Sequence, residues 1–154
     1  MDSADDRTAL PVPARAAGRV PAGTDPCPCG SGDSISACCG AFLAGERLAP
    51  TAVQLMRSRY AAYALGDAAH LLRTWDPSTR PSAAELADSL GAGLVWTRLV
   101  VHATEAGGPF DDAGTVEFTA LARDADGARV RMRETSRFVR RDGAWLYVDG
   151  DVTG

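Results

Sequence analysis

Apolar residues between positions 50 and 91 recur every three or four residues, the spacing that places side chains on one face of a helix. Thr51 and Gln54 have the spacing of a capping box at the start of the first stretch, and a glycine follows its last apolar position. Two shorter stretches, 67–76 and 82–91, begin with a capping aspartate and a capping serine. The pattern therefore predicts three helices.

After position 93 apolar and polar residues alternate, as in strands with one buried face. Asp-Gly pairs at 126–127 and 142–143 are typical of hairpin turns. Even-numbered residues of the second and third strands are expected to face the helices. Helices followed by an antiparallel meander predict an α+β fold with the helices on one sheet face. The four expected strands are Leu94–Thr104, Thr115–Arg123, Ala128–Arg140 and Ala144–Val152.

Residues 1–24 are rich in alanine, proline, glycine and aspartate without a periodic apolar face, which predicts a flexible tail. Hydrophobic residues make up 45% of the 154 residues, enough for one domain with a core. No apolar run approaches the roughly 18 residues of a membrane-spanning helix, and the first residues lack the basic and apolar regions of a signal peptide. We therefore expect a cytoplasmic protein and no membrane contact.

Sixteen basic residues against twenty acidic residues give a net charge of −4. Nucleic-acid binders carry surplus positive charge, so the balance argues against a nucleic-acid partner. Alternate positions of the third predicted strand nevertheless carry arginine. We expect this outer face to be solvated or packed against a second subunit of a homodimer. Its arginines are Arg129, Arg131, Arg133, Arg137 and Arg141.

Four cysteines, Cys27, Cys29, Cys38 and Cys39, lie within thirteen residues, and the rest of the chain has none. Four thiolates can surround a zinc ion tetrahedrally at about 2.3 Å per Zn–S bond. Disulfides or free thiols are the alternatives, but a reducing cytoplasm and the strain of a bridge between adjacent cysteines oppose disulfides. Because cysteines would fill all four positions, the predicted zinc is structural and not catalytic.

The run Cys-Pro-Cys-Gly-Ser-Gly followed by a Cys-Cys pair resembles the SEC-C motif, a small zinc-binding element, which we place at residues 25–45. The motif is also found at the C-terminus of the SecA translocation ATPase. Many SEC-C segments carry lysines between the two cysteine pairs, whereas residues 33–37 carry none. The resemblance therefore implies a zinc site without a basic docking surface.

Residues 50–152 resemble the YchJ-like family (UPF0225), whose members join an N-terminal SEC-C motif to an NTF2-like domain. This resemblance implies a cone in which N-terminal helices pack on a curved antiparallel sheet and leave a pocket. It implies no particular biochemical activity. The segments that carry it are Arg57–Tyr63, Thr74–Pro81, Glu134–Arg140 and Trp145–Gly150.

Glu134 is a carboxylate in an otherwise apolar row of the third predicted strand. A buried carboxylate requires a partner or a raised pKa, which makes Glu134 a candidate general base. The structural alternative is an ion pair with Arg57, Arg59 or Arg80, and such pairs are the more common case.

The implied pocket would draw its lining from the helices and the sheet. His102 is a second catalytic candidate because it lies at an even strand position with Trp96. Neither His102 nor His70 has a nucleophile arrangement nearby, and aromatic side chains more often fill cores, so structural roles are the alternative for all of them. The pocket candidates are Arg59, Tyr60, Tyr63, Trp75, Trp96 and Glu134.

Three functions are consistent with these features. The first is a non-enzymatic adaptor whose zinc element docks a protein partner and whose NTF2-like domain binds a small ligand or dimerises. This adaptor hypothesis predicts that loss of zinc leaves the larger domain folded. The alternative is a small-molecule isomerase, dehydratase or hydrolase that uses Glu134 as general base. The third is a ribosome- or RNA-associated zinc protein.

Overall fold

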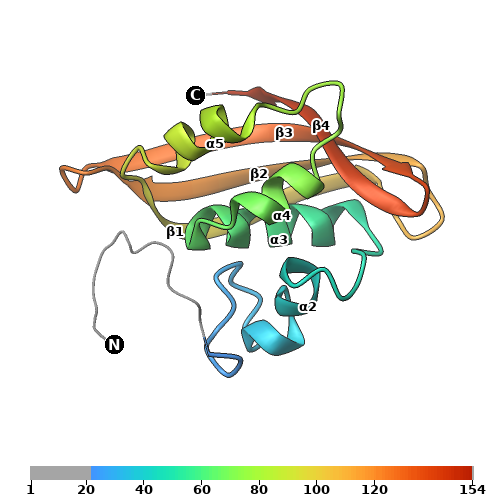
Figure 1. Cartoon of the computed structure of the whole chain (residues 1–154), viewed down its shortest axis with the longest axis horizontal. Coiled ribbons are helices and arrows are strands. Elements are labelled where there is room, and N and C mark those ends of the chain that lie inside the picture. The colour runs from blue at the N-terminus through green and yellow to red at the C-terminus, as the bar shows by residue number, and fades with distance from the viewer. Residues whose placement is uncertain (1–21, 154) are drawn as a thin grey trace.

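A computed structural model describes residues 22–153, so most of the predicted tail at 1–24 lies outside the described residues. Three helices pack on one face of a four-stranded antiparallel sheet in the order β1-β2-β3-β4 (Figure 1), which confirms the α+β fold. None of the helices in residues 22–153 is long and apolar enough to cross a membrane. The helices of this layer are α3 (Ala52–Leu65), α4 (Ala68–Arg73) and α5 (Ala83–Leu90).

The predicted capping residues start all three helices. Thr51 Oγ1 accepts a hydrogen bond from the Gln54 amide at 3.2 Å. Asp67 caps α4, and Ser82 caps α5 in a capping box with Glu85. Two further single turns, η1 (Ile35–Ala37) and α2 (Gly40–Leu43), precede them; both are too short to produce a recognisable hydrophobic period.

The sheet follows the predicted strands to within two residues at each end. The strands are β1 (Val95–Ala106), β2 (Ala113–Arg123), β3 (Arg129–Arg141) and β4 (Ala144–Val152). As predicted, the even-numbered residues of β2 face the helices: Val116, Phe118, Ala120 and Ala122 are all buried. In the register of the sheet, Phe118 lies opposite Glu134, so the carboxylate belongs to the same inner face.

Helix α3 lies between the sheet and the cysteine-bearing segment (Figure 1). Cys29, Ile35 and Phe42 belong to the same continuous hydrophobic core as Leu55 and Phe118. The segments that we predicted as separate units, 25–45 and 50–152, therefore share one core.

Two arginines also bind the cysteine-bearing segment to the helices through its backbone. Arg57 Nη1 donates to the Cys29 carbonyl at 3.1 Å. Arg73 Nη2 donates to the carbonyls of Phe42 and Leu43 at 3.3 and 3.2 Å. Because hydrogen bonds and apolar packing connect the two segments, order in one of them supports order in the other.

His70 is buried in α4 and is neutral. Arg73 Nη2 can only donate, so His70 Nδ1 accepts this bond at 2.9 Å and the proton lies on Nε2. Nε2 then donates to Ser58 Oγ at 2.9 Å, and Ser58 Oγ donates to the Leu55 carbonyl at 2.8 Å. This chain of bonds gives His70 a structural position in the interior.

Acidification is expected to destabilise the fold through His70. Burial, with the neighbouring Arg73 charge, lowers the pKa of His70 from 6.5 to about 4. The unfolded chain therefore binds more protons than the folded chain as the pH falls below 6.5. We expect wild type to lose about 2 kcal/mol more than His70→Gln between pH 7 and pH 5. Urea unfolding at both pH values measures this difference in the free energy of unfolding. The control is His102→Gln, which replaces an exposed histidine and should show the same decrease as wild type. An equal pH dependence in wild type and His70→Gln would contradict the assignment.

Candidate functional site

The four cysteine sulfurs form one cluster. All four Sγ atoms lie within 4.8 Å of one another, and none forms a disulfide. Cys38 Sγ lies 3.5 Å from Cys29 Sγ and 3.8 Å from Cys39 Sγ. A tetrahedron of Zn–S bonds of about 2.3 Å places its sulfurs about 3.8 Å apart, so the donor set fits a tetrahedral metal ion.

The backbone brings the two cysteine pairs together with a tight turn. The Cys27 amide donates to the Asp33 carbonyl at 3.0 Å, and Gly30 and Gly32 have φ values of 79° and 92° that suit glycine. Hydrogen bonds from the Cys27 and Cys39 thiols hold the pKa of Cys29 well below its usual range, whereas hydrogen bonds within the cluster and burial raise the pKa of Cys27 and Cys39. A metal ion binds cysteines as thiolates, so its binding to this cluster would release protons.

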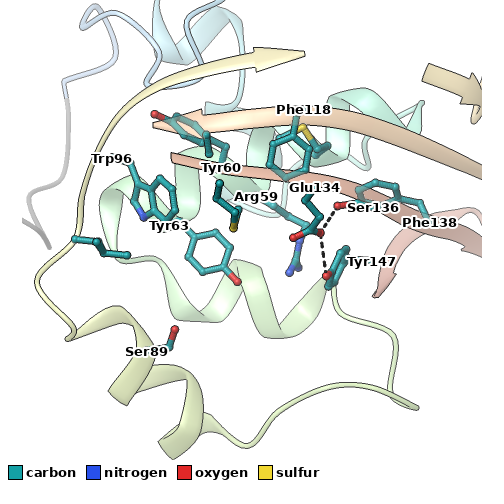
Figure 2. A pocket seen from close by; sticks show the side chains of 14 residues that line it. Arg59, Tyr60, Tyr63, Ser89, Trp96, Phe118, Glu134, Ser136, Phe138 and Tyr147 are labelled. Atoms are coloured by element: carbon teal, nitrogen blue, oxygen red, sulfur yellow. Dashed lines mark hydrogen bonds between the residues drawn. The ribbon is translucent and has the colours of Figure 1, made fainter. Parts of the chain in front are cut away.

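A cavity of about 300 Å³, partly open to solvent, lies between α3 and the inner face of the sheet (Figure 2). Five of the six predicted pocket residues line it: Arg59, Tyr60, Tyr63, Trp96 and Glu134. The even positions of β2 and β3 contribute most of the remainder. The further lining residues are Met56, Ser89, Leu94, Phe118, Ala120, Met132, Ser136, Phe138 and Tyr147.

Glu134 is 9% exposed and holds its carboxylate at one end of the cavity. Its Oε2 accepts hydrogen bonds from Ser136 Oγ and, at 3.2 Å, from Tyr147 Oη (Figure 2). Oε1 has no hydrogen-bond partner among residues 22–153. A Cβ on Gly150 would overlap the carboxylate, so the glycine gives Glu134 its space.

The ion pair that we expected for Glu134 does not form with any arginine of the described residues. Each candidate guanidinium donates to backbone carbonyls instead. Arg57 bonds to Cys29, Arg80 Nη2 donates to the Trp75 carbonyl at 3.0 Å, and Arg59 Nη1 donates to the Leu71 carbonyl at 2.9 Å. The expectation was wrong because all three arginines tie loop and helix backbone together.

Arg59 is buried at the same end of the cavity. Its Nη1 also donates to Thr74 Oγ1 at 2.8 Å. The guanidinium carbon lies 4.7 Å from the ring centre of Trp75 and 4.6 Å from that of Tyr147. Burial lowers the pKa of Arg59 to about 10, so the side chain keeps its charge at neutral pH. Two aromatic faces compensate the buried cation in place of water.

Trp75 does not line the cavity, although it was one of the predicted pocket residues. Helix α4 ends at Arg73, and Trp75 instead bridges to Tyr147 of β4 and packs edge-on against its ring at 5.2 Å. The helical spacing that suggested an inward position stops before Trp75. The face of its indole ring packs against the Arg59 guanidinium.

His102 also lies away from the cavity. The register of β1 against β2 shifts between Val101 and Ala103, so His102 is the extra residue of a β-bulge. Its Nε2 lies 2.7 Å from Thr119 Oγ1, on the outer face of the sheet. The two-residue period that placed His102 beside Trp96 fails because bulges interrupt the strand.

Tyr147 of β4 also lines the cavity, although it is not one of the six pocket candidates. It lies two residues from the buried Trp145, so the two-residue period of β4 places both side chains on the inner face. In the register of the sheet, Tyr147 lies opposite Phe138, and its hydroxyl reaches Glu134.

Three of the five arginines of the outer face, Arg133, Arg137 and Arg141, are paired with acids. Arg133 Nη2 lies 2.6 Å from Glu117, and Arg137 pairs with Asp149 and Asp151 at 2.5 and 2.8 Å. These pairs neutralise part of the positive charge on β3, whereas Arg129 and Arg131 form no ion pair with any residue of 22–153.

Comparison with known proteins supports the same organisation. The family model "YchJ, middle NTF2-like domain" matches residues 51–150. A UPF0225 protein of Streptomyces coelicolor is 48% identical over 128 residues, covering 83% of this chain and 96% of its own length. A UPF0225 protein of Deinococcus radiodurans is 51% identical over 124 residues, covering 80% and 87%.

Two solved SEC-C motif proteins share the fold. The solution structure from Rhodopseudomonas palustris has a TM-score of 0.75 at 35% identity, covering 83% of this chain and 98% of its own. The crystal structure from Psychrobacter arcticus has a TM-score of 0.70 at 23% identity, covering 86% and 85%. With its cysteine pairs ahead of the sheet and helices, the chain belongs to the YchJ-like UPF0225 family, in which a SEC-C motif precedes an NTF2-like domain.

Proposed function

We propose that this protein binds a small molecule in the cavity between α3 and the sheet. The observation that carries the proposal is a cavity with mostly apolar walls and two charged groups, Glu134 and Arg59, at one end. Small-molecule sites typically combine apolar walls with a few polar groups that orient the ligand, and about 300 Å³ lies at the lower end of their usual volumes.

Blocking the mouth of the cavity tests this proposal. Ser89 is exposed on α5 and lines the cavity, whereas its neighbour Asp88 does not. We expect Ser89→Trp to abolish the thermal stabilisation that small molecules from a screening library confer on wild type. Asp88→Trp adds the same side chain one position away and should leave that stabilisation unchanged. Equal responses from both variants would contradict binding in this cavity.

The four cysteines are proposed to hold zinc as a structural ion. Their sulfur spacing supports this choice, and a four-thiolate set leaves no coordination position for water or substrate. A reducing compartment such as the cytoplasm would keep the thiols available for the metal. Because α3 lies between the cluster and the cavity, the ion would brace the helix that provides Arg59 and Tyr60. Elemental analysis of protein purified under reducing conditions measures the metal, and one zinc per chain is expected.

Docking of a protein partner by the SEC-C element is a second candidate function. It is supported by the loop Gly30–Asp33, which is exposed beyond the buried cysteines. The structural core of the element is shared with the helices, so a surface variant tests docking better than a cysteine variant does. A partner that is captured by wild type and by Asp88→Arg, but not by Asp33→Arg, would support docking.

Proton transfer in the cavity is the enzymatic candidate. It is supported by Glu134 Oε1, the carboxylate oxygen without a partner among residues 22–153, while Oε2 is fixed by two hydroxyl donors. A carboxylate held in this way can accept a proton from a bound molecule. Exchange of a ligand C–H for deuterium in wild type, and its absence in Glu134→Gln, would support this function.

A further inference from the structure

The cavity contains opposite charges that are kept apart by one side chain. Tyr147 presents its ring face to the Arg59 guanidinium and its hydroxyl to Glu134 Oε2. Burial, with the nearby Glu134 charge, raises the pKa of the Tyr147 hydroxyl, so it remains a hydrogen-bond donor at neutral pH. The Arg59 and Glu134 side chains form no ion pair with each other, and Tyr147 contacts both of them.

Each charged group keeps free hydrogen-bonding capacity after its structural bonds are made. Glu134 uses Oε2 for Ser136 and Tyr147, and its Oε1 is free to accept. Arg59 uses Nη1 for Leu71 and Thr74 and also interacts with the Tyr63 hydroxyl, which leaves part of the five N–H groups of its guanidinium for a ligand. Figure 2 shows the guanidinium end lying between Tyr63 and Tyr147. A ligand that reaches this end meets one acceptor and one donor.

The walls above this polar end are apolar. Trp96 meets Tyr60 and Tyr63 with ring centres 6.2 and 6.3 Å apart, which forms a rigid aromatic wall. Methionine and phenylalanine side chains from α3, β2 and β3 complete it. Charged ligand groups would lose their hydration on entering such a space, and this loss must be compensated by the protein.

From these contacts we infer the class of ligand: an uncharged molecule with a flat apolar body and a head group that donates a hydrogen bond to Glu134 Oε1 and accepts one from Arg59. An anionic head would be attracted by Arg59 but repelled by Glu134, and a cationic head the reverse, so neither gains a net attraction that compensates for the loss of its hydration. A zwitterion would balance both charges but would have to desolvate two ions. This inference rests on the proposed function, because it names the ligand class of the same cavity.

Three isosteric probes separate these cases. 2-Naphthamide carries an uncharged donor–acceptor head, 2-naphthoate is its anionic counterpart and 2-naphthamidine its cationic counterpart. L-Phenylalanine is added as a fourth, zwitterionic probe. By calorimetric titration, we expect wild type to bind the amide about tenfold more tightly than either ion or L-phenylalanine. Glu134→Gln should reverse the order of amide and naphthoate, because Arg59 is then the remaining charge.

Two variants make the outcome decisive. Gly150→Ala keeps the Glu134 charge but displaces the carboxylate. It should weaken the binding of the amide without strengthening the binding of naphthoate. Glu117→Gln removes a carboxylate from the outer face and should change nothing in the cavity. If an ion or L-phenylalanine binds wild type more tightly than the amide, the inferred ligand class is wrong, but the proposed function of ligand binding stands. The same holds if Glu134→Gln does not reverse the affinities for the amide and naphthoate. Binding of none of the probes at millimolar concentration overturns the inference and counts against the proposed function.

Discussion

Removing the proposed zinc ion from the cysteine cluster is expected to destabilise all of residues 25–152 and not only the SEC-C segment. The reason is the shared core: Cys29, Ile35 and Phe42 pack with Leu55 and Phe118. Metal binding supplies the ordering free energy of such small elements. We expect a loss of at least about 4 kcal/mol, on the order of 15 °C in the unfolding midpoint. Thermal unfolding of zinc-loaded and chelator-treated protein, followed by tryptophan fluorescence, measures it.

Two variants of the cysteine-bearing segment accompany this experiment. Cys29→Ser should reproduce the effect of the chelator, because it removes a buried ligand. Ser36→Ala changes an exposed serine of the segment and should unfold like wild type. If the metal-free protein keeps the unfolding midpoint of its larger domain, the two segments are independent, as the adaptor hypothesis expected from sequence.

Replacing Arg59 is expected to produce the second large effect. Arg59→Met removes the donor for the Leu71 carbonyl and for Thr74, and it leaves the Glu134 carboxylate without a nearby positive charge. We expect a loss of roughly 3 kcal/mol at pH 7, the scale of an uncompensated buried polar group. Urea unfolding measures this loss.

A double-mutant cycle separates charge from packing at Arg59. Glu134→Gln in the Arg59→Met background should restore about 1 kcal/mol, because no uncompensated carboxylate remains. Arg57→Met loses a single bond to a backbone carbonyl on the other side of α3 and should cost less than Arg59→Met. If the changes in unfolding free energy caused by Arg59→Met and by Glu134→Gln add up to the change in the double variant, the two charges do not interact through the cavity.

The helices and strands were predictable because their signals are local. Capping residues such as Thr51 and Ser82, and the Asp-Gly turns, act within four residues of sequence, so the chain order alone locates them. The inner face of β2 and β3 followed from a regular two-residue period, which placed Glu134 correctly. The cysteine cluster was equally visible because all of its ligands lie within one short segment.

The errors arose where geometry depends on partners distant in sequence. The bulge between Val101 and Ala103 of β1 turned His102 outward. A bulge is defined by the register against a neighbouring strand, which a single-strand period does not contain. Arg59 lacked its expected ion pair for the same reason: the carbonyl of Leu71 and the ring of Tyr147 compete for its guanidinium.

The most direct test of the central claim uses two methionines of the cavity wall, Met56 and Met132. Their methyl groups can be observed by NMR in zinc-loaded protein with ¹³C-methyl methionine. On addition of 2-naphthamide, we predict saturable shifts of both signals in wild type and none in Ser89→Trp. Met56 and Met132 signals of wild type that stay unshifted with 2-naphthamide, 2-naphthoate, 2-naphthamidine and L-phenylalanine, each at millimolar concentration, would contradict the claim that this cavity is a small-molecule site.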